Sequence, residues 1–231
     1  MKTVGIIGGI APESTIDYYR QLLAAYRERV HDKSAPAVLI NSIDMHYMLG
    51  LITAGELGKV TDYLAAEVLK LSKAGADFAL IAANTPHIVF DEIQRRSPIP
   101  MISIVEATCA VAKKLQLKNL TLFGTRFTMQ GSFFPKVFSR EGIELVAPAE
   151  DEQTFIHDKY LNELGNAIFL PETRQRLVDI AERMRQQQGI DGLILAGTEL
   201  PLIFREVKTL SIPVLDTTRI HVEAAIAELL A

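Results

Sequence analysis

The chain has 231 residues, 48% of them apolar, and a formal net charge of −4. The apolar content excludes a disordered chain, and the single cysteine, Cys109, excludes an intrachain disulfide, which suits a reducing cytoplasm. The acidic balance argues against a nucleic-acid partner, and no apolar run approaches the roughly 20 residues of a membrane span. Residues 1–9 are apolar but short and broken by glycine, which predicts a strand rather than a signal peptide. We therefore expect a cytoplasmic protein that works without a membrane.

Short apolar runs alternate with longer amphipathic stretches along the whole chain. The runs predict strands at residues 4–7, 37–43, 78–82, 101–104, 120–123, 144–147, 192–195 and 214–215. The amphipathic stretches predict helices at residues 14–30, 57–73, 87–95, 105–115, 131–140, 153–167, 173–188, 202–208 and 221–230. Alternation of this kind is typical of an α/β fold, in which helices cover both faces of parallel sheets.

An internal repeat divides the chain. Residues 75–85 match residues 189–199 at a constant offset of 114, since 189 minus 75 and 191 minus 77 give the same value. The match continues into the next helix, where residues 89–93 correspond to 203–207. It predicts two pseudo-symmetric, flavodoxin-like domains: residues 1–104 plus 208–231, with the closing strand and helix completing the first half, and residues 105–207.

The strand ends are where a ligand is expected, because parallel sheets bind ligands outside the carboxyl ends of their strands. With two such domains, these ends would line a cleft between them. Small polar groups follow the predicted strands there, and we expect them to bind the substrate: Gly9, Ser14, Ser42, Asn84, Thr85, Thr125, Thr128 and Thr198. The glycine loop at residues 8–15 fits a small carboxylate, or equally a tight turn with Ser14 as a helix cap.

His87 and Glu199 are the titratable candidates at these strand ends. His87 could hold or move a proton, although a lone histidine is more often structural. Glu199 could act as a base or cap the next helix. No His, Cys, Asp or Glu spacing repeats a zinc pattern, so no metal is expected, and Cys109 fits a core residue of an apolar helix.

These motifs resemble those of the aspartate/glutamate racemase family. The resemblance is carried by residues 8–15 with 17–19, 84–87, 124–129 and 198–201, and it extends over essentially the whole chain. It implies two pseudo-symmetric α/β domains, a homodimer, an amino acid or small dicarboxylate as ligand, and proton transfer at the α-carbon without a cofactor or metal.

The resemblance also implies two catalytic cysteines, one on each face of the α-carbon. They directly precede the Asn-Thr and Thr-Glu motifs, where this chain has Ala83 and Gly197. We therefore expect weak or altered proton transfer, with His87 and Glu199 as substitutes, and recovery of α-proton exchange on restoring both cysteines. The alternatives are a catalytically silent ligand-binding homologue and a deliberately disabled racemase. The true ligand and its stereochemistry stay open.

Overall fold

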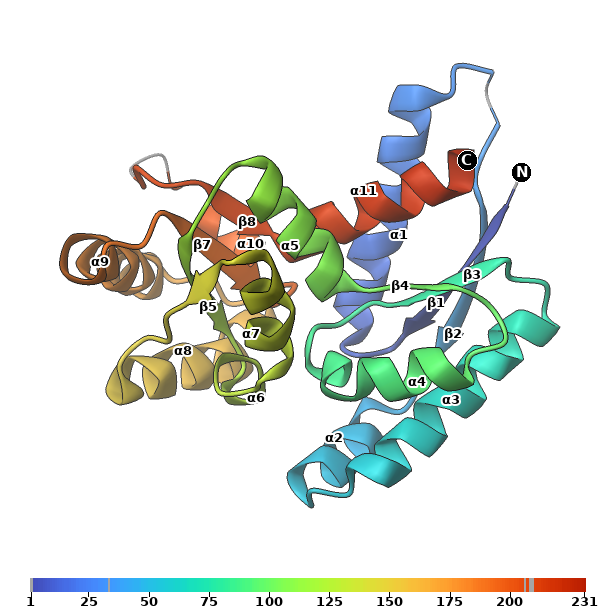
Figure 1. Cartoon of the computed structure of the whole chain (residues 1–231), viewed down its shortest axis with the longest axis horizontal. Helices are drawn as coiled ribbons and strands as arrows, with labels where there is room; N and C mark the ends of the chain where they lie inside the picture. Colours follow the sequence, from blue (N-terminus) through green and yellow to red (C-terminus); the bar gives the residue numbers. More distant parts are fainter. Residues whose placement is uncertain (1, 33, 206, 208–209) are drawn as a thin grey trace. The chain divides into compact units, whose positions relative to one another are not determined.

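The computed structural model describes residues 2–32, 34–205, 207 and 210–231, and it shows an α/β protein with two parallel sheets (Figure 1). The chain divides into two compact units. The first comprises Met1–Ala107 and Thr218–Ala231, and the second comprises Thr108–Thr217.

The sheet of the first unit has the order β2-β1-β3-β4 and is parallel throughout. Its strands are β1 (Thr3–Gly8), β2 (Ala37–Ser42), β3 (Phe78–Ile81) and β4 (Met101–Ile102). One face packs against α1 (Pro12–Arg29) and α11 (Thr217–Leu230), which lie side by side in Figure 1. The other face packs against α2 (Met45–Thr53), α3 (Leu57–Lys73), η1 (Thr85–Val89) and α4 (Phe90–Arg96).

Alternating side chains in the strands build the two cores of this unit. Ile6 and Leu80 belong to the core beneath α1 and α11, whereas Ile7 and Ile81 belong to the core beneath α3 and α4. Neighbouring strand residues point to opposite faces, so a continuous apolar run is needed when both faces are covered.

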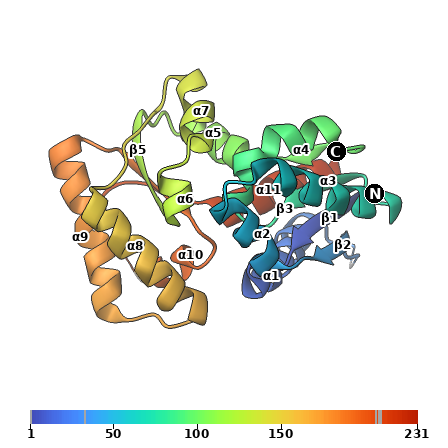
Figure 2. The same ribbon diagram turned by 90° about the horizontal axis from the view of Figure 1, so that it is seen from below.

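The sheet of the second unit has the order β6-β5-β7-β8 and is also parallel. Its strands are β5 (Asn119–Gly124), β6 (Glu144–Leu145), β7 (Gly192–Ala196) and β8 (Val214–Asp216). Its helices and turns are α5 (Ile104–Lys114), which enters from the first unit, α6 (Arg126–Met129), α7 (Phe133–Phe138), η2 (Ser139–Glu141), α8 (Glu150–Asn162), η3 (Leu164–Asn166), α9 (Pro171–Gln188) and α10 (Leu200–Phe204). Helix α8 contacts β5 and α6 and lies beside α9 (Figure 2).

The two sheets confirm the repeat. Both have the flavodoxin-like strand order, and β3 and β7 hold the same place in it. The register agrees as well: Phe78 pairs with Val4 of β1, and Gly192, its counterpart in the repeat, pairs with Leu120 of β5.

One strand lies in a different sheet from the one expected. Residues 214–216 form β8, which pairs with β7, so the prediction that the closing strand completes the first half is wrong. The repeat explains the result, because β7, α10 and β8 are the counterparts of β3, η1 and β4.

The helices also differ in places from those expected. The expected helix at 202–208 is α10, which ends at Phe204, while residues 206 and 208, with the expected domain boundary at 208, lie outside the described residues. The expected helix at 131–140 is α7 followed by η2. Helix α2 was not predicted.

Candidate functional site

The loop between β1 and α1 requires glycine at residue 9. Gly9 has φ +83°, and a Cβ there would lie 2.5 Å from the carbonyl oxygen of Ile43. The Gly9 N–H donates to the hydroxyl of Thr15 at 2.8 Å. Helix α1 begins after Ala11, so the alternative in which Ser14 caps this helix is wrong. The buried Ser14 and Thr15 instead lie in the first turn of the helix.

The end of β3 leads into a buried polar turn. Ala83, Asn84 and Thr85 are all buried, and Asn84 precedes the η1 turn. Ser42 lies at the end of β2, which is the edge strand next to β1, and is exposed. The first unit therefore brings Gly9, Ser42, Asn84 and Thr85 to the carboxyl ends of three adjacent strands.

The imidazole of His87 is held by the main chain at both nitrogens. Nδ1 lies 2.9 Å from the carbonyl oxygen of Ala83, and Nε2 accepts the N–H of Ile104 at 3.2 Å. A carbonyl only accepts, so Nδ1 carries the proton and the ring is neutral. Burial, and next the neighbouring His221, lower the pKa of His87 to about 3. This geometry connects the end of β3 to the start of α5, and it gives no support to His87 as a proton carrier.

A second buried histidine lies beside it. The ring centroids of His221 and His87 are 6.2 Å apart. His221 Nε2 lies 2.9 Å from the carbonyl oxygen of Ile102, and Nδ1 lies 3.0 Å from the hydroxyl of Tyr18. Burial lowers the pKa of His221 to about 4, so both rings are neutral at physiological pH. His221 was not among the predicted site residues, and Tyr18 belonged only to the motif at residues 17–19.

In the second unit, two threonine hydroxyls meet at the end of β5. Thr125 precedes α6, and its side chain accepts the N–H of Thr128 at 3.3 Å, while the two hydroxyl oxygens are 3.1 Å apart. The N–H of Arg126 donates to Nδ1 of His157 on α8 at 3.2 Å. Burial, and next the Arg126 charge, lower the pKa of His157.

The end of β7 carries a carboxylate that accepts two hydroxyls. Oε2 of Glu199 accepts the Thr198 hydroxyl at 2.7 Å and the hydroxyl of Tyr160. Glu199 immediately precedes α10, but its side chain makes no capping hydrogen bond, so the reading as a helix cap is wrong. Burial, and next the Glu199 charge, raise the pKa of Tyr160 well above its usual value.

Tyr160 reaches this cluster from α8, and it was not predicted as a site residue. A Cβ built on Gly197 would lie 2.4 Å from Cε2 of Tyr160, 2.9 Å from Cζ and 3.0 Å from the hydroxyl oxygen. The tyrosine ring therefore fills the space beside residue 197. The available signal was the glycine itself, because a missing side chain in a packed interior leaves room that another side chain fills.

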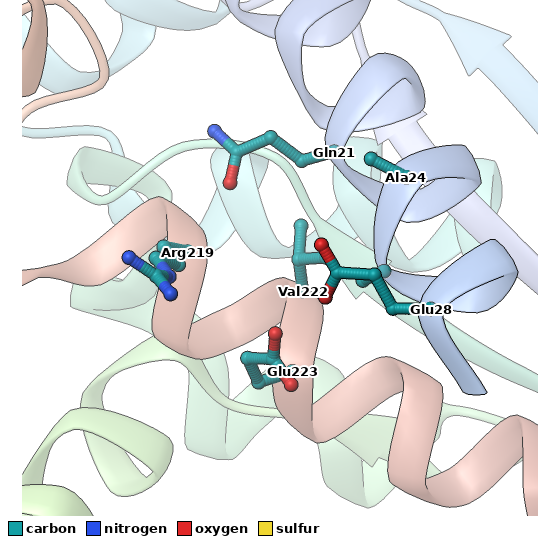
Figure 3. A pocket seen from close by; sticks show the side chains of 7 residues that line it. Gln21, Ala24, Glu28, Arg219, Val222 and Glu223 are labelled. Atoms are coloured by element: carbon teal, nitrogen blue, oxygen red, sulfur yellow. The ribbon is translucent and has the colours of Figure 1, made fainter.

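A cavity of about 150 Å³ lies elsewhere, between α1 and α11 of the first unit (Figure 3). Gln21 and Glu28 of α1 face Arg219 and Glu223 of α11 across it. Its lining includes none of the predicted site residues.

Among the residues that the structure describes, no group of three or more His, Cys, Asp or Glu side chains could hold a metal ion. Within the same residues, no helix is both long and apolar enough to cross a membrane. Cys109 is buried in α5.

Known proteins show similarity to this chain over nearly its whole length. The Asp/Glu/Hydantoin racemase family matches residues 7–225. The broad specificity amino-acid racemase RacX of Bacillus subtilis (strain 168) is 26% identical over 238 residues, covering 99% of this chain and 98% of that protein.

Two crystal structures match along the full length of both chains. A candidate Asp/Glu racemase from Yersinia pestis is 29% identical with a TM-score of 0.92. An aspartate racemase homologue from Pyrococcus horikoshii OT3 is 33% identical with a TM-score of 0.87. The family match covers nearly the whole chain, and both sheets take part in the structural match. The chain belongs to the Asp/Glu/hydantoin racemase family.

Proposed function

We propose that this chain binds a small amino acid or dicarboxylate at its strand ends and transfers the α-proton weakly or from one face. The observation that carries the proposal is that this chain has no thiol at either of the two strand ends. The single cysteine of the sequence, Cys109, is buried in α5, whereas Ala83 and Gly197 stand at the strand ends where the family resemblance implies thiols. The name of the Bacillus subtilis relative supports an amino acid as the ligand.

The binding groups of the proposal are neutral hydrogen-bonding groups. Thr85, Thr125, Thr128 and Thr198 supply hydroxyls and Asn84 an amide, which together suit a carboxylate and an ammonium group. No cofactor is part of the proposal.

The absence of both thiols lowers the expected rate of racemisation. A general acid or base typically contributes about 10²- to 10⁴-fold, and racemisation needs one on each face of the α-carbon. With His87 held by the main chain, Glu199 is the titratable group of the original pair that remains available to the proposal. Inversion should therefore be very slow, while binding persists.

Calorimetric titration with the L- and D-forms of aspartate, glutamate and neutral amino acids tests the binding step. We expect saturable binding of at least one of them, and circular dichroism of the same mixtures should show inversion far below that of a two-thiol racemase. Rapid inversion would contradict the proposal, as would the absence of binding by every amino acid and dicarboxylate in the panel. Binding without α-proton exchange in deuterated water would assign the chain to the silent ligand-binding alternative.

A homodimer also belongs to the proposal, because the resemblance implies it, and so does a cytoplasmic location, which the single cysteine favours. Light scattering coupled to gel filtration should give twice the chain mass of 25.6 kDa. A mass equal to that of one chain would contradict this part.

A further inference from the structure

Helix α8 supplies the end of β7 with a side chain that this strand end lacks. Residue 197 is glycine, and the ring of Tyr160 lies where a side chain at this position would begin. The hydroxyl oxygen lies 3.0 Å from the ideal Cβ position of residue 197. In a larger residue at position 197, the atom bonded to Cβ would therefore lie in the region that this hydroxyl occupies.

The hydroxyl has an acceptor for its proton. It donates to Oε2 of Glu199, the same oxygen that accepts the Thr198 hydroxyl at 2.7 Å. Glu199 and Thr198 are both buried, so the three groups interact with little competition from water. The raised pKa of Tyr160 means that the phenol holds its proton at rest, and the carboxylate is the group that can take it.

We propose that Tyr160 takes the place of the side chain absent at residue 197 and that its hydroxyl, backed by Glu199, exchanges the α-proton of a bound amino acid on one face. This inference rests on the proposed function, because it needs an amino acid at the strand end. The α C–H bond breaks and its proton passes to the tyrosine oxygen, while the proton of the tyrosine passes to Glu199 Oε2. The electron pair of the broken bond is delocalised into the substrate carboxyl group as an enediolate.

Reversal of the same two transfers returns a proton to the same face. A proton on the pair that has exchanged with solvent gives isotope exchange with retention of configuration. Exchange from one face without inversion is therefore the signature that distinguishes this pair from two thiols on opposite faces.

Incubation in deuterated water tests the inference, with mass spectrometry for deuterium uptake and chiral chromatography for configuration. We expect the wild-type chain to exchange the α-proton of one enantiomer of a bound amino acid with retention. Tyr160→Phe and Glu199→Gln should each lower the exchange rate at least 100-fold while the calorimetric affinity changes less than 10-fold. Tyr26→Phe is the matched control, because its hydroxyl contacts Ser34 and lies outside the strand ends, and it should exchange at the wild-type rate.

The outcomes separate the two proposals. If no amino acid binds to any variant, the proposed function fails. If an amino acid binds but the wild-type chain does not exchange, the inference about Tyr160 fails and the chain is the silent ligand-binding homologue. If the wild-type chain exchanges and Tyr160→Phe exchanges at the wild-type rate, the inference about Tyr160 fails and the proposed function stands.

A measurement that needs no ligand tests whether the ring of Tyr160 fills the space beside residue 197. Gly197→Ala should lower the melting temperature by about 3–10 °C, because the new methyl group would overlap the ring of Tyr160. The same change in a Tyr160→Ala background should have an effect close to zero. An equal effect of Gly197→Ala in both backgrounds would overturn the claim that Tyr160 fills this space.

Discussion

The hydrogen bonds of His87 are those of a neutral ring and of no other state. Nδ1–H meets the carbonyl of Ala83, and the lone pair of Nε2 meets the N–H of Ile104. A proton on Nε2 would face the Ile104 N–H, placing two donors against each other. At the scale of the residue, His87 links the main chain after β3 to the main chain at the start of α5. These hydrogen bonds hold the loop that carries Ala83 and Asn84.

His87→Leu should therefore destabilise the protein. Leucine leaves the Ala83 carbonyl and the Ile104 N–H buried without this partner, which costs about 2–5 kcal/mol of the free energy of unfolding. Urea denaturation measures the loss, with the exposed His31→Leu as the control, expected within about 0.5 kcal/mol of wild type. If His87→Leu unfolds like the wild-type chain but loses α-proton exchange, the histidine is a proton carrier after all.

Restoring the thiols also depends on Tyr160. Ala83→Cys with Gly197→Cys was expected to recover exchange, but a side chain at 197 would meet the tyrosine ring. This double variant should invert amino acids poorly, and the triple variant that adds Tyr160→Ala should invert them at least 10-fold faster. Chiral chromatography of aspartate and glutamate compares the two. Equal rates would show that the ring moves aside without help.

At the scale of the element, α2 depends on one side chain. Asp44 precedes the helix, and its carboxylate accepts the N–H groups of His46 at 2.9 Å and Tyr47 at 3.1 Å. The helix sequence itself is apolar at most positions and contains Gly50. It therefore lacks the separate polar and apolar faces by which an amphipathic helix is recognised. The capping aspartate is the remaining sequence signal for this helix.

Asp44→Ala should lower the free energy of unfolding by about 0.5–2 kcal/mol, because two N–H groups at the start of α2 lose their acceptor. Asp44→Asn keeps an oxygen acceptor and should lose less than half of that amount. Thermal denaturation of the three proteins gives the comparison. Equal losses in the two variants would show that the charge, and not the hydrogen bond, stabilises the helix start.

At the scale of the molecule, the repeat made most of the architecture predictable. Strand order and register follow from two copies of one topology. The expectation for β8 was the exception, because this strand belongs to the second sheet, where it is the counterpart of β4. The strand-end residues were found because strand ends can be located from apolar runs. Tyr160 was not found, because a residue on a distant helix reaches the site through packing that no local pattern encodes.

The two buried histidines predict how the stability of the whole protein depends on pH. Their pKa values in the folded protein are about 3 for His87 and about 4 for His221, whereas an unfolded histidine titrates near pH 6.5. The unfolded state therefore binds more protons, so the contribution of both rings is complete above pH 6.5 and is lost as the pH falls toward their folded values. At pH 5 the loss should be about 2 kcal/mol for each ring, or about 4 kcal/mol in total.

Urea unfolding at several pH values between 5 and 7.5 measures this loss, a range that lies above the ordinary titration of carboxylates. His157, whose pKa is also lowered, contributes with the same sign, so His157→Gln serves as the background in which the two buried rings are measured. Ring signals in nuclear magnetic resonance spectra supply the site-specific reading: those of His87 and His221 should stay unchanged from pH 7.5 to 5. A midpoint near 6.5 for either ring would mean that it opens to solvent in the folded protein, and the main-chain connection between the end of β3 and the start of α5 would then be weaker than its hydrogen bonds indicate.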